Sequence, residues 1–125
     1  MTAITEGLNL GDLLKYEAPN LYSREQVTVV AGQNLALGAV VGRITASAKF
    51  KVFDPAATDG SELPAGILLG ACDATLIDRD DALLLARHGM VASNAVVWPA
   101  GITAEQKTTA LAQMSSLGVL VRQGV

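Results

Sequence analysis

The lone histidine and one acidic run are the residues of this 125-residue chain best suited to chemistry. His88 stands beside Gly89 at an expected turn between strands, and a Ser-His-Asp system would need a nucleophile motif that the sequence does not supply. Residues 78–81 hold three carboxylates, but a calcium loop starting there would need glycine at position six and glutamate at position twelve, where Leu83 and Gly89 stand. We therefore predict no catalytic residue and no metal site, and interpret the acidic run as a solvated turn between apolar strands.

Cysteine and glycine patterns also give no sign of an enzyme. The single cysteine, Cys72, excludes an intrachain disulfide and a zinc site built on several thiolates. Its apolar neighbours predict a buried, unreactive side chain. The glycines in residues 38–42 lack the third glycine and the following acid of a dinucleotide fingerprint, and no phosphate-binding loop occurs. The sequence thus predicts no cofactor and no small-molecule substrate.

Charge and hydropathy exclude further classes of protein. Nine Lys and Arg against twelve Asp and Glu give a net charge of -3 without a basic run, which argues against a nucleic-acid partner. Apolar runs such as residues 82–86 are too short to span a membrane, and Glu6, Asn9 and Asp12 interrupt any secretory signal, so we expect synthesis in the cytosol. Charged residues make up 17% of the chain, below the roughly 25% of an average soluble domain, which indicates that part of the surface is covered by other protein.

Two regions differ in pattern along the chain. In residues 1–26, apolar side chains are spaced without a turn-bounded strand, and Pro19 breaks any helix that begins near Leu10. We interpret this region as an N-terminal arm that stays mobile until it finds a surface to cover. Residues 27–125 form the expected β-rich domain.

Short strands and one helix are predicted for that domain. Strand-like runs separated by turn residues occupy residues 27–30, 35–45, 49–53, 65–71, 82–87 and 119–121. The run at 65–71 and that at 82–87 are almost continuously apolar, so both should lie deep in the core. Thr103 and Gln106 form a capping box that starts a helix from about Ala104 to Ser116, and Gly118 ends it. The predicted class is mainly β with one short helix (α+β).

The order of these features resembles the head decoration protein family of tailed bacteriophages, typified by decoration protein D of phage lambda. The residues that carry the resemblance are Leu14-Lys15-Tyr16-Glu17, Gly38-Ala39-Val40-Val41-Gly42, Phe53-Asp54-Pro55 with Asp59-Gly60, Gly66-Ile67-Leu68, Arg87-His88-Gly89, and Trp98-Pro99 before a helix ending at Leu117-Gly118. The resemblance implies a β-clip-like fold with a flexible N-terminal arm. It also implies a homotrimer on the outer surface of the phage head.

In such a protein the partner is the major capsid protein, which the trimer binds at local threefold axes of the expanded head and stabilises against DNA pressure. The protein would be made in the host cytoplasm and end in the virion. The arm residues expected to contact the capsid are Leu13, Leu14, Tyr16, Leu21 and Tyr22. Trp98 and Pro99 are expected in trimer or core packing.

Two alternatives stay open at this point. Another trimeric accessory protein of the virion, in a tail or spike, would form trimers that do not bind capsids. A small β-fold enzyme would instead have a cleft with convergent polar groups, and changing His88 or Asp80 to alanine would abolish its turnover.

Overall fold

The computed structural model describes residues 10–18 and 22–123. In chain order the elements are α1 (Leu10–Leu13), β1 (Leu14–Glu17), β2 (Arg24–Val29), β3 (Gln33–Leu35), β4 (Val40–Arg43), β5 (Phe50–Val52), β6 (Pro64–Leu68), β7 (Cys72–Ala74), β8 (Arg79–Leu85), β9 (Gly89–Ala92), the 3₁₀ turn η2 (Ser93–Ala95), α2 (Ala104–Ser116) and β10 (Val119–Arg122). Ten strands and one long helix in the described residues confirm the predicted mainly β class.

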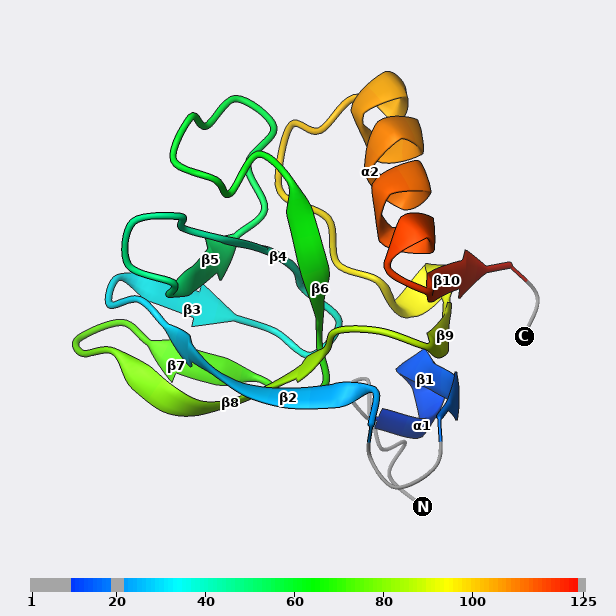
Figure 1. Cartoon of the computed structure of the whole chain (residues 1–125), viewed down its shortest axis with the longest axis horizontal. Helices are drawn as coiled ribbons and strands as arrows, with labels where there is room; N and C mark the ends of the chain where they lie inside the picture. The colour runs from blue at the N-terminus through cyan, green and yellow to red at the C-terminus, as the bar shows by residue number, and fades with distance from the viewer. Residues whose placement is uncertain (1–9, 19–21, 124–125) are drawn as a thin grey trace, which may run out of the picture.

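Five strands form a closed barrel in the order β2-β5-β4-β6-β8 (Figure 1). Its longest contact is the antiparallel pairing of β2 with β8, while β2 meets β5 in parallel at one residue pair, Val29 and Phe50. Strands β3 and β7 form a separate antiparallel ribbon. Because every barrel strand has a partner on both sides, the barrel leaves no open sheet edge of its own.

The apolar runs are continuous because the barrel walls separate two cores. On β6, Ile67 belongs to the larger core cluster, which also holds Met114 of α2, and its neighbour Leu68 belongs to the smaller one among the barrel strands and the β3–β7 ribbon. Leu85 and Leu84 on β8 divide in the same way. Side chains alternate across a strand, so burial on both faces requires apolar residues at successive positions. The prediction that these runs lie deep in the core is confirmed for their middle parts, whereas Ala71 at the end of the first run is exposed and Arg87 at the end of the second is half-buried.

Strand β9 is the centre of a second sheet, which lies beside the barrel (Figure 1). On one side β1 pairs with it antiparallel, with Tyr16 opposite Met90 and Glu17 opposite Gly89. On the other side β10 pairs with it in parallel, with Val119 opposite Gly89. The two strands nearest the chain ends are thereby fastened to the same strand.

Helix α2 has the predicted bounds and caps. Thr103 accepts a hydrogen bond from the Gln106 backbone, and the Gln106 side chain accepts one from the Thr103 backbone. Ala110 and Met114 are fully buried in the larger core cluster. Gly118 follows the helix with φ +84°, a conformation that favours glycine. Helix and cap were readable from sequence because both depend on residues close together in the chain.

The N-terminal region differs from the predicted arm. Its described residues form α1, β1 and the start of β2, and the expected boundary at residue 26 falls inside β2. Leu13 is fully buried in the larger core cluster, and Leu14 packs against it. The described residues from 10 onward are therefore part of the folded body, since the partners that order them come from distant β9 and η2.

Two local predictions are also corrected. The acidic run is not a turn between strands, because β8 begins at Arg79 and includes Asp80 and Asp81, which leaves only Asp78 in the preceding loop. The expected strand at 35–45 is divided into β3 and β4 by a turn at Gly38, whose φ is +91°. A Cβ at Gly38 would meet the Ala95 carbonyl oxygen at 2.3 Å, so this turn requires glycine.

Candidate interaction surfaces

The N-terminal surface carries two exposed aromatic side chains. Tyr16 on β1 is 59% exposed, and Tyr22, just before β2, is 55% exposed. Of the other residues expected to contact a capsid, Leu13 is buried, Leu14 is half-buried, and Leu21 lies outside the described residues. The structure thus leaves Tyr16 and Tyr22 of this set available for a partner.

A salt bridge joins the chain just after Tyr16 to the chain just after Tyr22. The Glu17 carboxylate accepts hydrogen bonds from Arg24 Nε at 2.8 Å and Arg24 Nη2 at 2.6 Å, and from Ser23 Oγ at 2.9 Å. Ser23 is fully buried, and Glu17 supplies its hydroxyl with a partner. The Arg24 hydrogen bond is the main reason that the pKa of Glu17 lies below its usual value. We call this group the Glu17 clamp.

Tyr22 rests on the turn between β8 and β9. Its backbone carbonyl accepts a hydrogen bond from Arg87 Nη1 at 2.6 Å, and the Arg87 guanidinium lies 5.2 Å from the Tyr22 ring centre. The His88 ring lies 5.3 Å from the same ring at an angle of 51°. His88 has φ +51°, and its carbonyl accepts a hydrogen bond from the Ala18 backbone at 3.0 Å. The histidine therefore holds the N-terminal surface in place.

Trp98 and Pro99 lie on the segment between η2 and α2. Trp98 is half-buried and packs against the larger core cluster, and Lys107 Nζ lies 6.0 Å from its ring centre. Pro99 is half-buried and lines a surface groove with Ile102 and Phe53. Trp98 thus contributes to core packing, and the role of either residue in a trimer stays a prediction.

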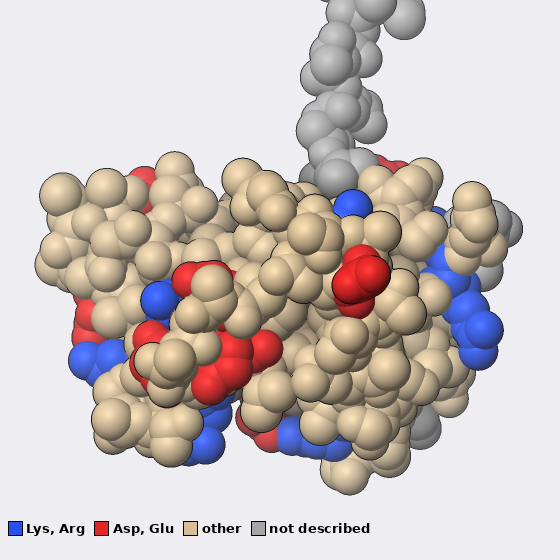
Figure 2. All heavy atoms as spheres, turned by 90° about the horizontal axis from the view of Figure 1, so that it is seen from above, with Lys and Arg blue, Asp and Glu red and all other residues tan. Residues whose placement is uncertain are grey.

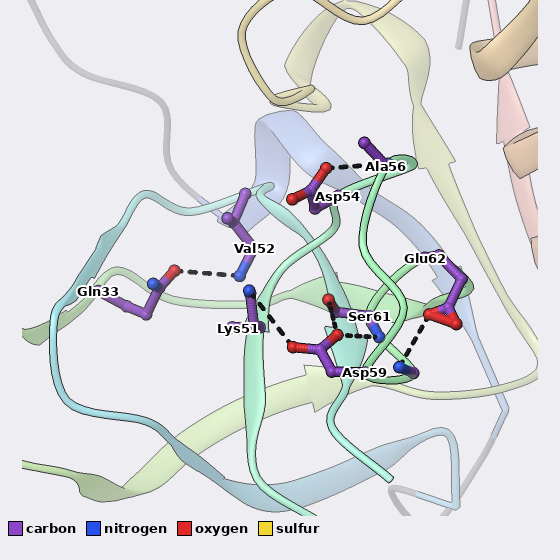
Figure 3. Close-up of polar contacts among 9 residues, drawn as sticks. Gln33, Lys51, Val52, Asp54, Ala56, Asp59, Ser61 and Glu62 are labelled. Atoms are coloured by element: carbon purple, nitrogen blue, oxygen red, sulfur yellow. Dashed lines mark hydrogen bonds and ion pairs between the residues drawn. The ribbon is translucent and has the colours of Figure 1, made fainter.

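The loop between β5 and β6 is held by its own polar contacts (Figure 3). Asp59 accepts hydrogen bonds from the Ser61 backbone at 3.0 Å and the Ser61 hydroxyl at 2.5 Å, which lower the pKa of Asp59. Glu62 accepts one from the Gly60 backbone at 2.8 Å, and Lys51 Nζ lies 3.5 Å from Asp59. These contacts hold the loop in one conformation and tie it to β5. The carboxylates of Asp59 and Glu62 therefore stabilise the loop.

Charges are unevenly distributed over the face that carries this loop and α2. Figure 2 shows acidic side chains gathered on one side of the face and a broad area with few charges beside them. Helix α2 carries only Glu105 and Lys107 as charged residues. Few charged groups would have to lose their water if a protein covered this area.

The loop between β7 and β8 exposes two large aliphatic side chains that sequence reasoning missed. Leu76 is 88% exposed and Ile77 is 68% exposed. Their signal in the sequence was an apolar pair enclosed by Thr75 and Asp78, with no apolar periodicity around it. This pattern alone does not distinguish a buried apolar pair from an exposed one, and the exposure is seen only in the structure.

Within residues 10–18 and 22–123, no group of three or more His, Cys, Asp or Glu side chains is arranged to hold a metal ion. Cys72 is buried, which confirms the predicted burial, and burial raises the pKa of its thiol. Among the helices in this part of the chain, none is long and apolar enough to cross a membrane.

Comparison with protein families places the chain among the structural proteins of the bacteriophage head. The matching family is "Bacteriophage lambda head decoration protein D", and the match spans residues 3–119. The chain belongs to this family. No individual curated protein matched it. Membership makes the protein a component of the phage head and supports a role in capsid decoration.

Proposed function

We propose that this protein decorates the outside of the expanded phage head as a homotrimer at local threefold axes. Its partner is the major capsid protein, and binding stabilises the head against the pressure of packaged DNA. The protein is made in the host cytoplasm and joins the outer surface of the virion. The family match over residues 3–119 is the observation that carries this proposal.

In this proposal the capsid contacts come from residues 1–26, of which those described from 10 onward pack on the decoration domain of residues 27–125. Tyr16 and Tyr22 are the anchors, because exposed aromatic side chains bury a large area at a low cost in side-chain entropy. Leu13 and Leu14 act indirectly by holding α1 and β1 on the body. The Glu17 clamp fixes the spacing between the two tyrosines.

Trimerisation turns weak contacts into stable binding. When one copy of a trimer has bound, the other two face their sites at a high effective concentration, which strengthens binding by about 10²–10⁴ if the geometry fits. A head lattice before expansion would present the sites at the wrong spacing. A ligand that binds one lattice state and not the other stabilises the state that it binds.

Electron microscopy of expanded heads mixed with the purified protein tests this proposal. We expect threefold density on the outer surface at local threefold axes, and no such density on heads before expansion. Trimers that leave expanded heads bare would overturn the proposal and favour a tail or spike accessory.

Point variants test the anchors better than truncation. Removing residues through Arg24 would delete core residue Leu13 and part of the barrel. The double variant Tyr16→Ser and Tyr22→Ser should lower the affinity for heads at least about tenfold. Leu63→Ser is the matched control, because Leu63 is 55% exposed on the β5–β6 loop, away from β1. Equal binding by both variants would show that the tyrosines are not the anchors.

A further inference from the structure

The tip between β7 and β8, residues 75–78, presents apolar side chains on a fixed support. Leu76 and Ile77 are the two most exposed large apolar side chains among the described residues, at 88% and 68%. Together with Asp73, Thr75 and Arg79 they line a shallow surface hollow. Exposed aliphatic pairs of this kind mark protein contacts more often than free surface.

Hydrogen bonds on both sides hold the tip. Before it, Asp73 accepts hydrogen bonds from the Thr75 backbone at 3.1 Å and from the Thr75 hydroxyl. After it, Asp78 accepts one from the Ala31 backbone at 2.8 Å and pairs with Lys49. A loop tied down in this way loses little conformational freedom when a partner covers it.

Arg79 strengthens the base of the tip. Its guanidinium hydrogen bonds to the Asp81 carboxylate at 2.8 and 3.2 Å and to the Asp73 carbonyl at 3.3 Å. It therefore connects β8 to β7 close to the two ends of the tip. The apolar pair is presented by a loop whose two ends are held by β7 and β8.

The same chain carries a groove of matching size on another part of its surface. The groove has a volume of 440 Å³ and lies between the loop after β5 and the segment before α2. Phe53, Pro55, Pro99 and Ile102 are among its apolar lining residues. An apolar cavity of about 150 Å³ holds a molecule as large as benzene, so the groove is large enough to receive aliphatic side chains.

Charge and position also match. The tip hollow contains one carboxylate and one cation, Asp73 and Arg79, and the groove contains Asp54 and Lys51. Arg79 and Lys51 keep their partners Asp81 and Asp59, so neither surface brings an unpaired cation to the contact. In Figure 1 the tip lies at the lower left, whereas the walls of the groove lie in the upper part, so one copy cannot fill its own groove.

We propose that Leu76 and Ile77 of one copy insert into this groove of a second copy of the same chain. The contact is heterologous, because tip and groove are different surfaces, and repetition around a rotation axis closes a ring. This inference rests on the homotrimer of the proposed function and assigns its subunit contact. Pro99 then lies at the subunit interface.

The mass of the full-length protein tests the contact first. In the double variant Leu76→Ser and Ile77→Ser, we expect the concentration for half-dissociation of the trimer to rise about 100-fold or more in light scattering or native mass spectrometry. Leu63→Ser is the control, since Leu63 is exposed but lies outside both surfaces. A double variant that stays trimeric like the control overturns the inference.

Cross-linking tests the same contact without weakening it. The double variant Leu76→Cys and Ala100→Cys, treated with a short bismaleimide, should give a covalent ring of three, because Ala100 lines the groove. Each single variant should stay uncross-linked, since buried Cys72 is protected. A covalent dimer of the Leu76→Cys single variant would indicate a tip-to-tip contact and overturn the inference.

Failure of this inference is distinguishable from failure of the proposed function. Trimers that form through the tip but do not bind expanded heads would contradict the proposed decoration and leave the tip contact intact. Decorated heads with trimers that tolerate loss of Leu76 and Ile77 would contradict the tip contact alone.

Discussion

Glu17 accepts a bidentate pair of hydrogen bonds from Arg24, at 2.6 and 2.8 Å, and so joins the end of β1 to the start of β2. Both side chains are about one-fifth exposed, at 22% and 21%, and the same carboxylate serves the buried Ser23 hydroxyl. One residue thus connects the second sheet to the barrel.

Glu17→Gln should lower the free energy of unfolding by about 1–2 kcal/mol at pH 7, since it removes charge-assisted hydrogen bonds. The pKa of Glu17 is lowered in the folded protein, chiefly by Arg24, so its stabilising effect is present above the usual value of 4.5. The effect is lost as pH falls through the lowered pKa. Urea unfolding of both proteins at several pH values should therefore give curves that converge in acid.

Asp80→Asn serves as the control for that experiment, because Asp80 is exposed on β8. Its effect on stability should be within about 0.5 kcal/mol at pH 7. A Glu17→Gln loss that stays constant down to acidic pH would contradict the assigned role of the carboxylate.

Gly42→Ala should destabilise the barrel by about 3 kcal/mol or more. A Cβ at this position of β4 would lie 2.6 Å from both Cα and the carbonyl oxygen of Ser61, and backbone atoms cannot move aside cheaply. At Gly70 nothing lies within 4 Å, so Gly70→Ala should be neutral or slightly stabilising. Thermal unfolding compares the two, and similar melting temperatures would refute the packing argument.

Thr103→Ala should cost about 1 kcal/mol, because the N-terminal backbone of α2 loses its cap. The matched change, Thr108→Ala, lies in the exposed middle of the same helix and should be neutral or stabilising, since alanine favours helices. For a domain of this size the first change lowers Tm by roughly 4 °C. Calorimetry of both variants would detect the difference, and an equal loss would argue against the capping box.

Cys72 should react with a thiol reagent only when the smaller core opens. Its side chain is 6% exposed, and burial raises the pKa of the thiol, which disfavours the reactive thiolate. Modification in native buffer should be slow and should accelerate with denaturant. Rapid, complete labelling of the folded protein would contradict this placement.

Local signals made part of the fold predictable from sequence. Helix α2 was predicted because Thr103 and Gln106 are three residues apart and identify its start. The strands β6 and β8 were predicted because burial on both faces leaves a continuous apolar run.

The remaining features depend on partners far away in the chain. Strand β1 is only four residues long and buries none of them fully, and it exists because β9 offers a free edge and the core accepts Leu13. Asp80 and Asp81 were interpreted as turn residues because their charge hid the pairing of β8 with β2. Exposure of Leu76 and Ile77 could not be predicted, since a sequence does not say which apolar residues find no core.

The position of β9 between the first and last strands determines when the chain can fold during synthesis. Arg87 binds the Tyr22 carbonyl across 65 residues, and Gln26 binds the Asp80 carbonyl across 54. A ribosome therefore releases β2 long before β8 exists to pair with it, and β9 acquires its parallel neighbour only once β10 has emerged. Folding that relies on such distant pairings is slow, and the nascent chain leaves its apolar strands uncovered meanwhile. We expect the barrel to close only after β8 has emerged, and the second sheet to be complete only when nearly the whole polypeptide has been translated.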